Sequence, residues 1–242
     1  MKKLVICCCF INCLFFAANA QLQDTITNNK RLNNTYGLRV GLDINKLITT
    51  ATNKNYKGFE INGDYRLTKK WYLAGELGAE ERTLDDDAIN STTNGSFIRV
   101  GADYNAHKNL IGMRNLIFTG FRYGFSTFDQ QLNSFTIIQQ DNFFENPDRV
   151  SGISSTALSA HWVEFVAGVK TEVLNNIFLG FSVSVRRLIS EQKPNGFDNF
   201  FVPGFGRTND ASEFAAGFSY YISYYIPLYK KIKKSSKKDK ES

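Results

Sequence analysis

The stretch HWVEFVAGVKTEVLNNIFLGFSVSVRRLI, from His161 to Ile189, decides the fold. Apolar residues alternate with polar or small residues along two arms. The apolar positions are Val163, Phe165, Ala167 and Val169 on the first arm and Ile177, Leu179, Phe181, Val183 and Val185 on the second. Successive side chains leave a strand on opposite sides, so this alternation predicts two β-strands. We expect Leu174–Asn176 to form the turn, because Asn tolerates the positive φ of tight hairpin loops.

Each arm is about twelve residues long, whereas strands of soluble sheets usually have about five or six. A tilted strand that crosses a bilayer needs roughly nine to eleven residues. The second face of the hairpin combines charges such as Glu164, Lys170 and Arg186 with small residues such as Gly168 and Gly180. This mixture suits a narrow, wet or salt-bridged barrel interior, which makes the apolar face the lipid face.

The same alternation recurs along the chain. Further strands are predicted at Tyr36–Leu47, Lys57–Leu67, Trp71–Arg82, Ile98–Tyr104, Leu116–Phe128 and Phe214–Ile226. Longer polar loops near Thr49–Tyr56, Leu84–Gly95, Asp129–Thr156 and Ser190–Ser212 alternate with short turns, as in outer-membrane barrels. The sequence therefore predicts an all-β fold, an eight-stranded antiparallel up-and-down transmembrane β-barrel. The alternative is a soluble periplasmic lipocalin-like barrel, in which the apolar face lines a ligand cavity.

The range from Tyr36 to Tyr229 resembles the small eight-stranded outer-membrane barrels of the OmpA/OmpX type, and barrel proteins of similar length from Gram-negative bacteria. The resemblance rests on the strand pattern, not on a specific motif. Members of the first group end on an aromatic residue of the last strand; here Tyr229 takes that place and thirteen residues follow it. The resemblance implies the outer membrane of a Gram-negative bacterium, with outer-membrane lipid around the barrel.

The ends of the chain have their own composition. Residues 1–20 read as a cleaved signal peptide, with Lys2 and Lys3 before an apolar run and Ala18-Asn19-Ala20 at its end. Residues 21–35 read as a flexible periplasmic lead-in, 36–229 as the barrel and 230–242 as a Lys-rich periplasmic tail. The tail either contacts anionic headgroups or is a solvated end. Its seven lysines, against Asp239 and Glu241, give the tail a net charge of +5, and Lys2 and Lys3 add +2, so the range between has a net charge near −1 although the whole chain has +6. The barrel range therefore predicts no nucleic-acid surface.

The polar face of the predicted strands carries charges of both signs. They are Arg39, Asp43, Glu60, Asp64, Arg66, Glu76, Glu80, Arg82, Arg99, Asp103, Arg122, Glu164, Lys170, Glu172 and Arg186. One interpretation is an ion path through the barrel. The other is a mutually neutralising network that plugs the lumen, because buried charges must be paired. The nearly balanced signs and the narrow interior of an eight-stranded barrel favour the plug.

Two predicted loops share the tetrapeptide Asp-Asn-Phe-Phe, which ends in Phe143-Phe144 in the first loop and in Phe200-Phe201 in the second. Exposed aromatic clusters mark partner surfaces, so these loops are candidates for contact with a protein partner. The alternative is that the two loops pack on each other as a cap. We expect either a monomeric barrel or a subunit of a larger envelope complex.

A weaker pattern suggests chemistry at the rim. Ser159 and His161 share a face, and a three-residue turn would bring Glu191 opposite Ser159. A nucleophile, a base and an orienting carboxylate need such proximity. The set resembles the rim site of outer-membrane lipid deacylases, with the order of Ser and His reversed. It makes a lipid-modifying hydrolase the runner-up to a non-enzymatic structural or accessory barrel.

No cofactor or metal site is expected from the sequence. All four cysteines, Cys7, Cys8, Cys9 and Cys13, lie within the predicted signal peptide, which excludes disulfides and thiolate metal sites from the mature chain. No phosphate-binding loop or metal-ligand spacing is present in the sequence.

Overall fold

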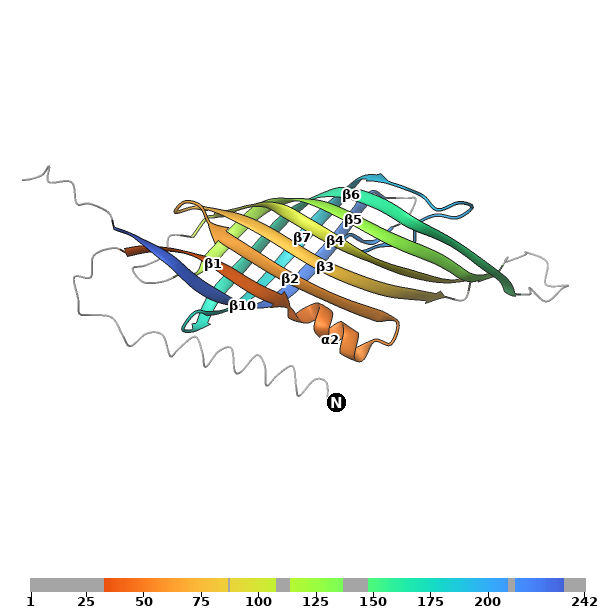
Figure 1. Ribbon diagram of the computed structural model, residues 1–242, viewed down its shortest axis with the longest axis horizontal. Helices are drawn as coiled ribbons and strands as arrows, with labels where there is room; N and C mark the ends of the chain where they lie inside the picture. The colour runs from red at the N-terminus through yellow and green to blue at the C-terminus, as the bar shows by residue number, and fades with distance from the viewer. Residues whose placement is uncertain (1–32, 87, 108–113, 137–147, 209–211, 233–242) are drawn as a thin grey trace, which may run out of the picture. The chain divides into compact units, whose positions relative to one another are not determined.

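Eight long strands form a closed antiparallel barrel in a computed structural model, which describes residues 33–86, 88–107, 114–136, 148–208 and 212–232 (Figure 1). The strands are β1 (Asn33–Asp43), β2 (Tyr56–Arg66), β3 (Trp71–Asp86), β4 (Ile89–Asn105), β5 (Leu116–Thr136), β6 (Asp148–Leu174), β7 (Ile177–Glu191) and β10 (Phe214–Ile232). Each strand pairs with the next long strand along the chain, and β1 closes the ring against β10. The predicted eight-stranded up-and-down barrel is confirmed. Residues Thr35–Tyr229 form one compact unit.

The seam between β1 and β10 depends on close backbone approach. The rings of Tyr36 and Tyr229 stack with their centroids 5.2 Å apart. A Cβ atom added to Gly41 would collide with the carbonyl oxygen of Ile222 and with the side chain of Ser223. Glycine at this position lets the first and last strands meet, and closure of the ring removes the unpaired edges that an open sheet would expose.

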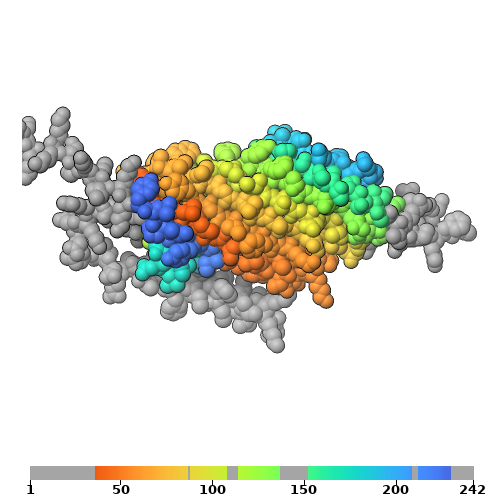
Figure 2. All heavy atoms as spheres, viewed as in Figure 1, coloured from red at the N-terminus to blue at the C-terminus, as the bar shows by residue number. Residues whose placement is uncertain are grey.

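Side chains of opposite character occupy the two faces of the barrel wall. Phe165, Phe181 and Ile222 point outward and remain 43%, 37% and 42% exposed, whereas Arg99 and Glu164 point inward and are each 2% exposed. Figure 2 shows the viewed wall as a continuous surface of side chains from α2 and β2 in orange to β6 in green. A lipocalin-like barrel needs the reverse arrangement, so the soluble alternative is wrong for this chain.

The strands on one side of the ring are longer than the sequence predicts. The pairs Asp86↔Ile89 and Thr136↔Asp148 lie within ranges that read as the loops Leu84–Gly95 and Asp129–Thr156. These extensions are rich in Thr, Ser, Asn and Gln on both faces, so they lack the apolar alternation that marks a strand. They are strands nevertheless, because pairing with neighbouring strands satisfies the hydrogen bonds of their backbone groups.

A helix replaces the end of the first predicted strand. The sequence predicts a strand to Leu47 and then a loop, but β1 ends at Asp43 and α2 (Ile44–Thr52) follows. The Asp43 carboxylate accepts hydrogen bonds from the backbone N–H groups of Asn45 and Lys46, at 2.8 and 3.3 Å. This N-cap satisfies two of the donors that a helix start leaves free. Among the described residues, no helix is long and apolar enough to cross a membrane.

Smaller boundaries also differ from the prediction. Leu174 pairs directly with Ile177, so the turn holds two residues rather than three, and Asn176 has the expected positive φ of 65°. β1 begins at Asn33, inside the predicted lead-in, and β10 continues to Ile232, into the predicted tail. The predicted signal peptide, most of the lead-in and residues 233–242 lie outside the described residues.

Candidate functional site

The centre of the lumen is an ionic network built around Arg99. Its guanidinium group lies 2.6 Å from Glu60 through Nη2, 2.7 Å from Glu76 through Nε and 3.3 Å from Glu164 through Nη1. Glu76 is the direct cross-strand partner of Arg99, whereas Glu60 comes from β2 and Glu164 from β6. A planar guanidinium with five N–H donors can serve several carboxylates at once.

Further cations extend this network across the interior. Arg122 lies 2.8 Å from Asp103 and 3.6 Å from Glu76. Arg186 lies 3.3 Å from Glu164. Lys46 reaches inward from α2 to Glu60, at 3.1 Å, and to Glu80.

A second group lies around Asp64, which is 2.7 Å from both Arg39 and Lys170. The two groups combine six cations with six carboxylates, listed here: Arg39, Lys46, Arg99, Arg122, Lys170 and Arg186 with Glu60, Asp64, Glu76, Glu80, Asp103 and Glu164. Charges removed from water are tolerated when each has an opposite partner, and these formal charges balance.

The remaining predicted lumen charges have other partners. Asp43 caps α2. Arg66 donates to the Thr68 carbonyl at 3.0 Å, and Arg82 lies over the ring of Phe201, 5.3 Å from its centroid. Glu172 pairs at 2.6 Å with Arg114.

Among the residues that the structure describes, Lys46 and Arg114 are two paired cations that the sequence pattern misses. Lys46 lies on a helix within a range predicted as strand, and Arg114 precedes β5 in a connection without alternation. No strand periodicity marks either residue as inward-facing.

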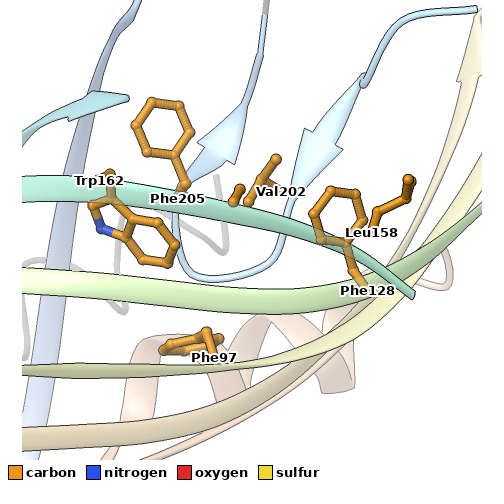
Figure 3. Packing of buried hydrophobic residues seen from close by; sticks show 7 residues of the cluster. Phe97, Phe128, Leu158, Trp162, Val202 and Phe205 are labelled. Atoms are coloured by element: carbon orange, nitrogen blue, oxygen red, sulfur yellow. The ribbon is translucent and has the colours of Figure 1, made fainter. Parts of the chain in front are cut away.

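A short hairpin from the loop between β7 and β10 fills one mouth of the barrel. It consists of β8 (Phe201–Val202) and β9 (Gly206–Arg207). Val202 and Phe205 are 0% and 2% exposed. They pack in one apolar cluster with Phe97, Phe128, Leu158, Ala160 and Trp162 from the barrel wall (Figure 3). We call residues Phe201–Arg207 the cap hairpin.

Hydrogen bonds fasten the cap hairpin and the chain just before it to the wall. The backbone N–H of Gly204 donates to Glu80 at 2.7 Å, and Arg186 Nη1 donates to the Phe205 carbonyl at 2.8 Å. Gln130 Nε2 donates to the carbonyl of Asp198 at 3.1 Å. Gly204 has φ +79°, and an added Cβ would collide with the ring of Phe97, so the turn requires glycine.

The four phenylalanines predicted to meet a partner have different positions. Phe143 and Phe144 lie outside the described residues. Phe201 is 3% exposed, so its expected place on an exposed partner surface is wrong; it packs inward, beneath Arg82. Phe200 is half-buried and stacks on Phe197, with centroids 6.2 Å apart.

The predicted rim set of Ser159, His161 and Glu191 does not assemble. A bulge in the β6–β7 register places Glu191 opposite Ala160, so Glu191 leaves the face that Ser159 and His161 share, and the expected pairing of Ser159 with Glu191 is wrong. Glu191 accepts a hydrogen bond from Asn199 at 2.9 Å, and the Ser159 backbone N–H donates to the side chain of Gln192 at 3.1 Å.

His161 has a different neighbour. Its Nδ1 lies 2.7 Å from the Tyr123 hydroxyl on the outer face of the wall. Among the residues that the structure describes, no three His, Cys, Asp or Glu side chains are grouped to hold a metal ion.

Comparison with protein families shows which family this closed, charge-filled barrel belongs to. The model of the family described as Domain of unknown function (DUF6048) matches residues 1–231. The chain belongs to this family. Comparison of the sequence with curated proteins gives no match.

Two solved structures of Ail, the attachment invasion locus protein of Yersinia pestis, resemble the chain. The free form matches with a TM-score of 0.36 and 11% sequence identity, and the match covers 79% of this chain and 94% of that chain. The complex with the heparin analogue sucrose octasulfate matches with a TM-score of 0.35, the same identity and the same coverage.

Proposed function

We propose that the chain is a closed outer-membrane barrel of a Gram-negative bacterium, which acts as a structural or accessory subunit of an envelope complex. The outward apolar side chains support a lipid environment, because a water-soluble barrel would not expose so many of them. Trp71, the first residue of β3, and Tyr224, which lies opposite the first residue of β7, are 49% and 54% exposed and suit an interfacial aromatic girdle. The predicted signal peptide supports export across the inner membrane.

The observation that carries this proposal is the filled lumen. The cap hairpin occupies one mouth, and behind it the network around Arg99 spans the interior from β2 to β6. An ion that passed through would have to break several of these buried pairs, which would leave charges without partners in the interior of the barrel and is strongly unfavourable. A barrel closed in two layers serves as a membrane anchor rather than as a pore.

The closed lumen predicts that the barrel does not conduct ions. We expect the purified full chain, reconstituted in planar lipid bilayers, to show no steady single-channel current at either polarity, because its interior charges are paired and its mouth is filled. A general porin in the same membrane is the positive control. A reproducible ohmic conductance from the folded, heat-modifiable barrel would contradict the proposal.

The partner contact is the second part of the proposal. The stacked pair of Phe197 and Phe200 is only half-buried beside the cap hairpin, which leaves aromatic surface for another protein. We expect Phe200→Ser to weaken recovery of a partner that co-purifies with the barrel from native membranes, while heat modifiability stays unchanged.

Phe201→Ser is the matched control for the partner test, because it is adjacent in the chain but faces inward. It should loosen the cap without removing outer aromatic surface. Partner recovery that is the same for wild type and Phe200→Ser would exclude this surface.

A further inference from the structure

The helix α2 lies where β1 ends and leaves part of β2 without a partner strand. β1 pairs with β2 only from Leu38↔Tyr65 to Leu42↔Ile61, so residues 56–60 of β2 have no partner on that side within the β1 register. The side chain of Thr50 meets this edge at Gly58: its hydroxyl accepts the backbone N–H at 2.8 Å and lies 3.0 Å from the carbonyl. Figure 1 shows α2 beside the adjoining end of β2. The helix therefore continues the wall where β1 stops.

One face of α2 points into the lumen. The Lys46 side chain is only 13% exposed, pairs with Glu60 and Glu80, and has its Nζ 4.5 Å from the centroid of the Phe97 ring. This attachment fixes the rotation of the helix about its axis. At about 100° per residue, the centre of the face formed by Ile44, Leu47, Ile48 and Ala51 lies roughly 150° around the helix from Lys46.

That opposite face is apolar and uncovered. Ile44, Leu47, Ile48 and Ala51 follow the i, i+3, i+4, i+7 spacing of an amphipathic helix. Leu47 and Ile48 are 39% and 57% exposed, and no residue of α2 is buried. Because this apolar stripe points away from the protein interior, we expect either an apolar medium or a partner to cover it.

The position of α2 along the wall indicates that lipid, rather than a partner, covers the stripe. On β2, Phe59 and Ile61 form part of the outward apolar surface at 44% and 38% exposed, next to the Gly58 contact of the helix. Tyr65 lies near the other end of β2, two strand positions from the turn to Trp71 at the aromatic girdle. Strands rise about 3.3 Å per residue, and a tilt of about 40° places Phe59 roughly 15 Å from the level of Tyr65. That is within an apolar band about 25 Å tall. The exposed Lys57–Glu81 ion pair, 2.8 Å long, lies just beyond Phe59 and marks the polar rim.

We propose that α2 is an interfacial helix, whose Leu47 and Ile48 insert among the acyl chains of the outer leaflet beside the barrel. This inference rests on the proposed membrane location and extends it to a segment that no strand pattern marks. The occupant is lipid because the stripe is continuous with the apolar surface of β2 at the same level. Lys46 holds the helix from the inside, and bilayer lipid covers it from the outside.

The test uses the cysteine-free chain that begins at Gln21, since all four cysteines precede that residue. Single nitroxide labels are placed at Ile48→Cys, at Val100→Cys on the outer face of β4 and at Lys54→Cys after the helix. The barrels are reconstituted in phosphatidylcholine vesicles, and folding of each is checked by heat modifiability. Power-saturation EPR then measures collision of each label with oxygen, which concentrates in lipid, and with a water-soluble nickel chelate. Leu47→Cys is the second helix label, in case Ile48→Cys perturbs folding.

We expect the Ile48 label to have an oxygen-to-nickel accessibility ratio near that of Val100 and well above that of Lys54. A ratio equal to that of Lys54, with Val100 still in lipid, overturns the helix inference and leaves the barrel proposal standing. Shielding of Ile48 from both reagents means that protein covers the stripe, which also overturns it. A nickel-accessible Val100 would instead contradict the membrane location itself.

Discussion

Replacing Arg99 with alanine will destabilise the barrel by about 3–5 kcal/mol, because removing one partner of a buried ion pair leaves uncompensated charge. Arg99 is 2% exposed and is within ion-pair distance of three carboxylates, Glu60, Glu76 and Glu164. Each of those carboxylates has a second cation, which is Lys46 for Glu60, Arg122 for Glu76 and Arg186 for Glu164, so part of the network will remain. Urea titration of the reconstituted barrel, followed by tryptophan fluorescence, measures the loss.

Arg187→Ala is the matched control for this experiment. Arg187 also pairs with a carboxylate, that of Glu213 at 3.3 Å, but both side chains are more than half exposed. Exposed ion pairs contribute about 0–1 kcal/mol, so this variant should unfold close to wild type. Equal effects of the two substitutions would show that burial of the network contributes nothing to stability.

Arginine in place of Val100 will cost about 2–4 kcal/mol, the range for a cation that faces lipid near the bilayer midplane. Val100 is 48% exposed on the outer face of β4, four residues from Tyr104 at the girdle end of the strand. The long side chain has no inward route to the ionic network, because Val100 and Arg99 point to opposite faces of the wall. The measurement is the free energy of unfolding in phospholipid vesicles.

Asn94→Arg supplies the comparison, since Asn94 lies on the same strand and the same face, six residues further out, and is exposed. Near or beyond the interface the same substitution costs about 0–1 kcal/mol. A difference between the two variants places the lipid boundary between these positions. If Val100→Arg is as harmless as Asn94→Arg, the outer face is not in lipid.

The interior cluster formed by Tyr72, Leu116, Phe118 and Val166 shows how far the alternation extends. Val166 is the one aliphatic residue on the polar face of its arm, and it reads as an exception to the pattern. In the barrel it points inward, is 4% exposed and packs with residues of β3 and β5. Inward positions therefore need not be polar; they need a partner across the lumen, which a local pattern does not supply.

The cap hairpin and α2 show why other features escaped prediction. Glu80 and Arg186 hold the hairpin in position through hydrogen bonds to Gly204 and Phe205, which are 124 and 19 residues away in the sequence. The helix depends on the early end of β1 and on the free edge of β2. The expected partner surface at Phe201 failed for the same reason, since only the closed ring creates the apolar mouth that receives this loop.

The sequence by itself determined the strand pattern, the number of strands and the side of the wall on which most charges lie, because side-chain alternation is a local property of each strand. Only the tertiary structure decided which charges pair, where the β6–β7 bulge turns Glu191 inward and which loop fills the mouth. These depend on strand register and ring closure, which bring together residues such as Glu60 and Arg99 from strands that are not neighbours. Periodicity along one strand contains no information about the strand across the lumen.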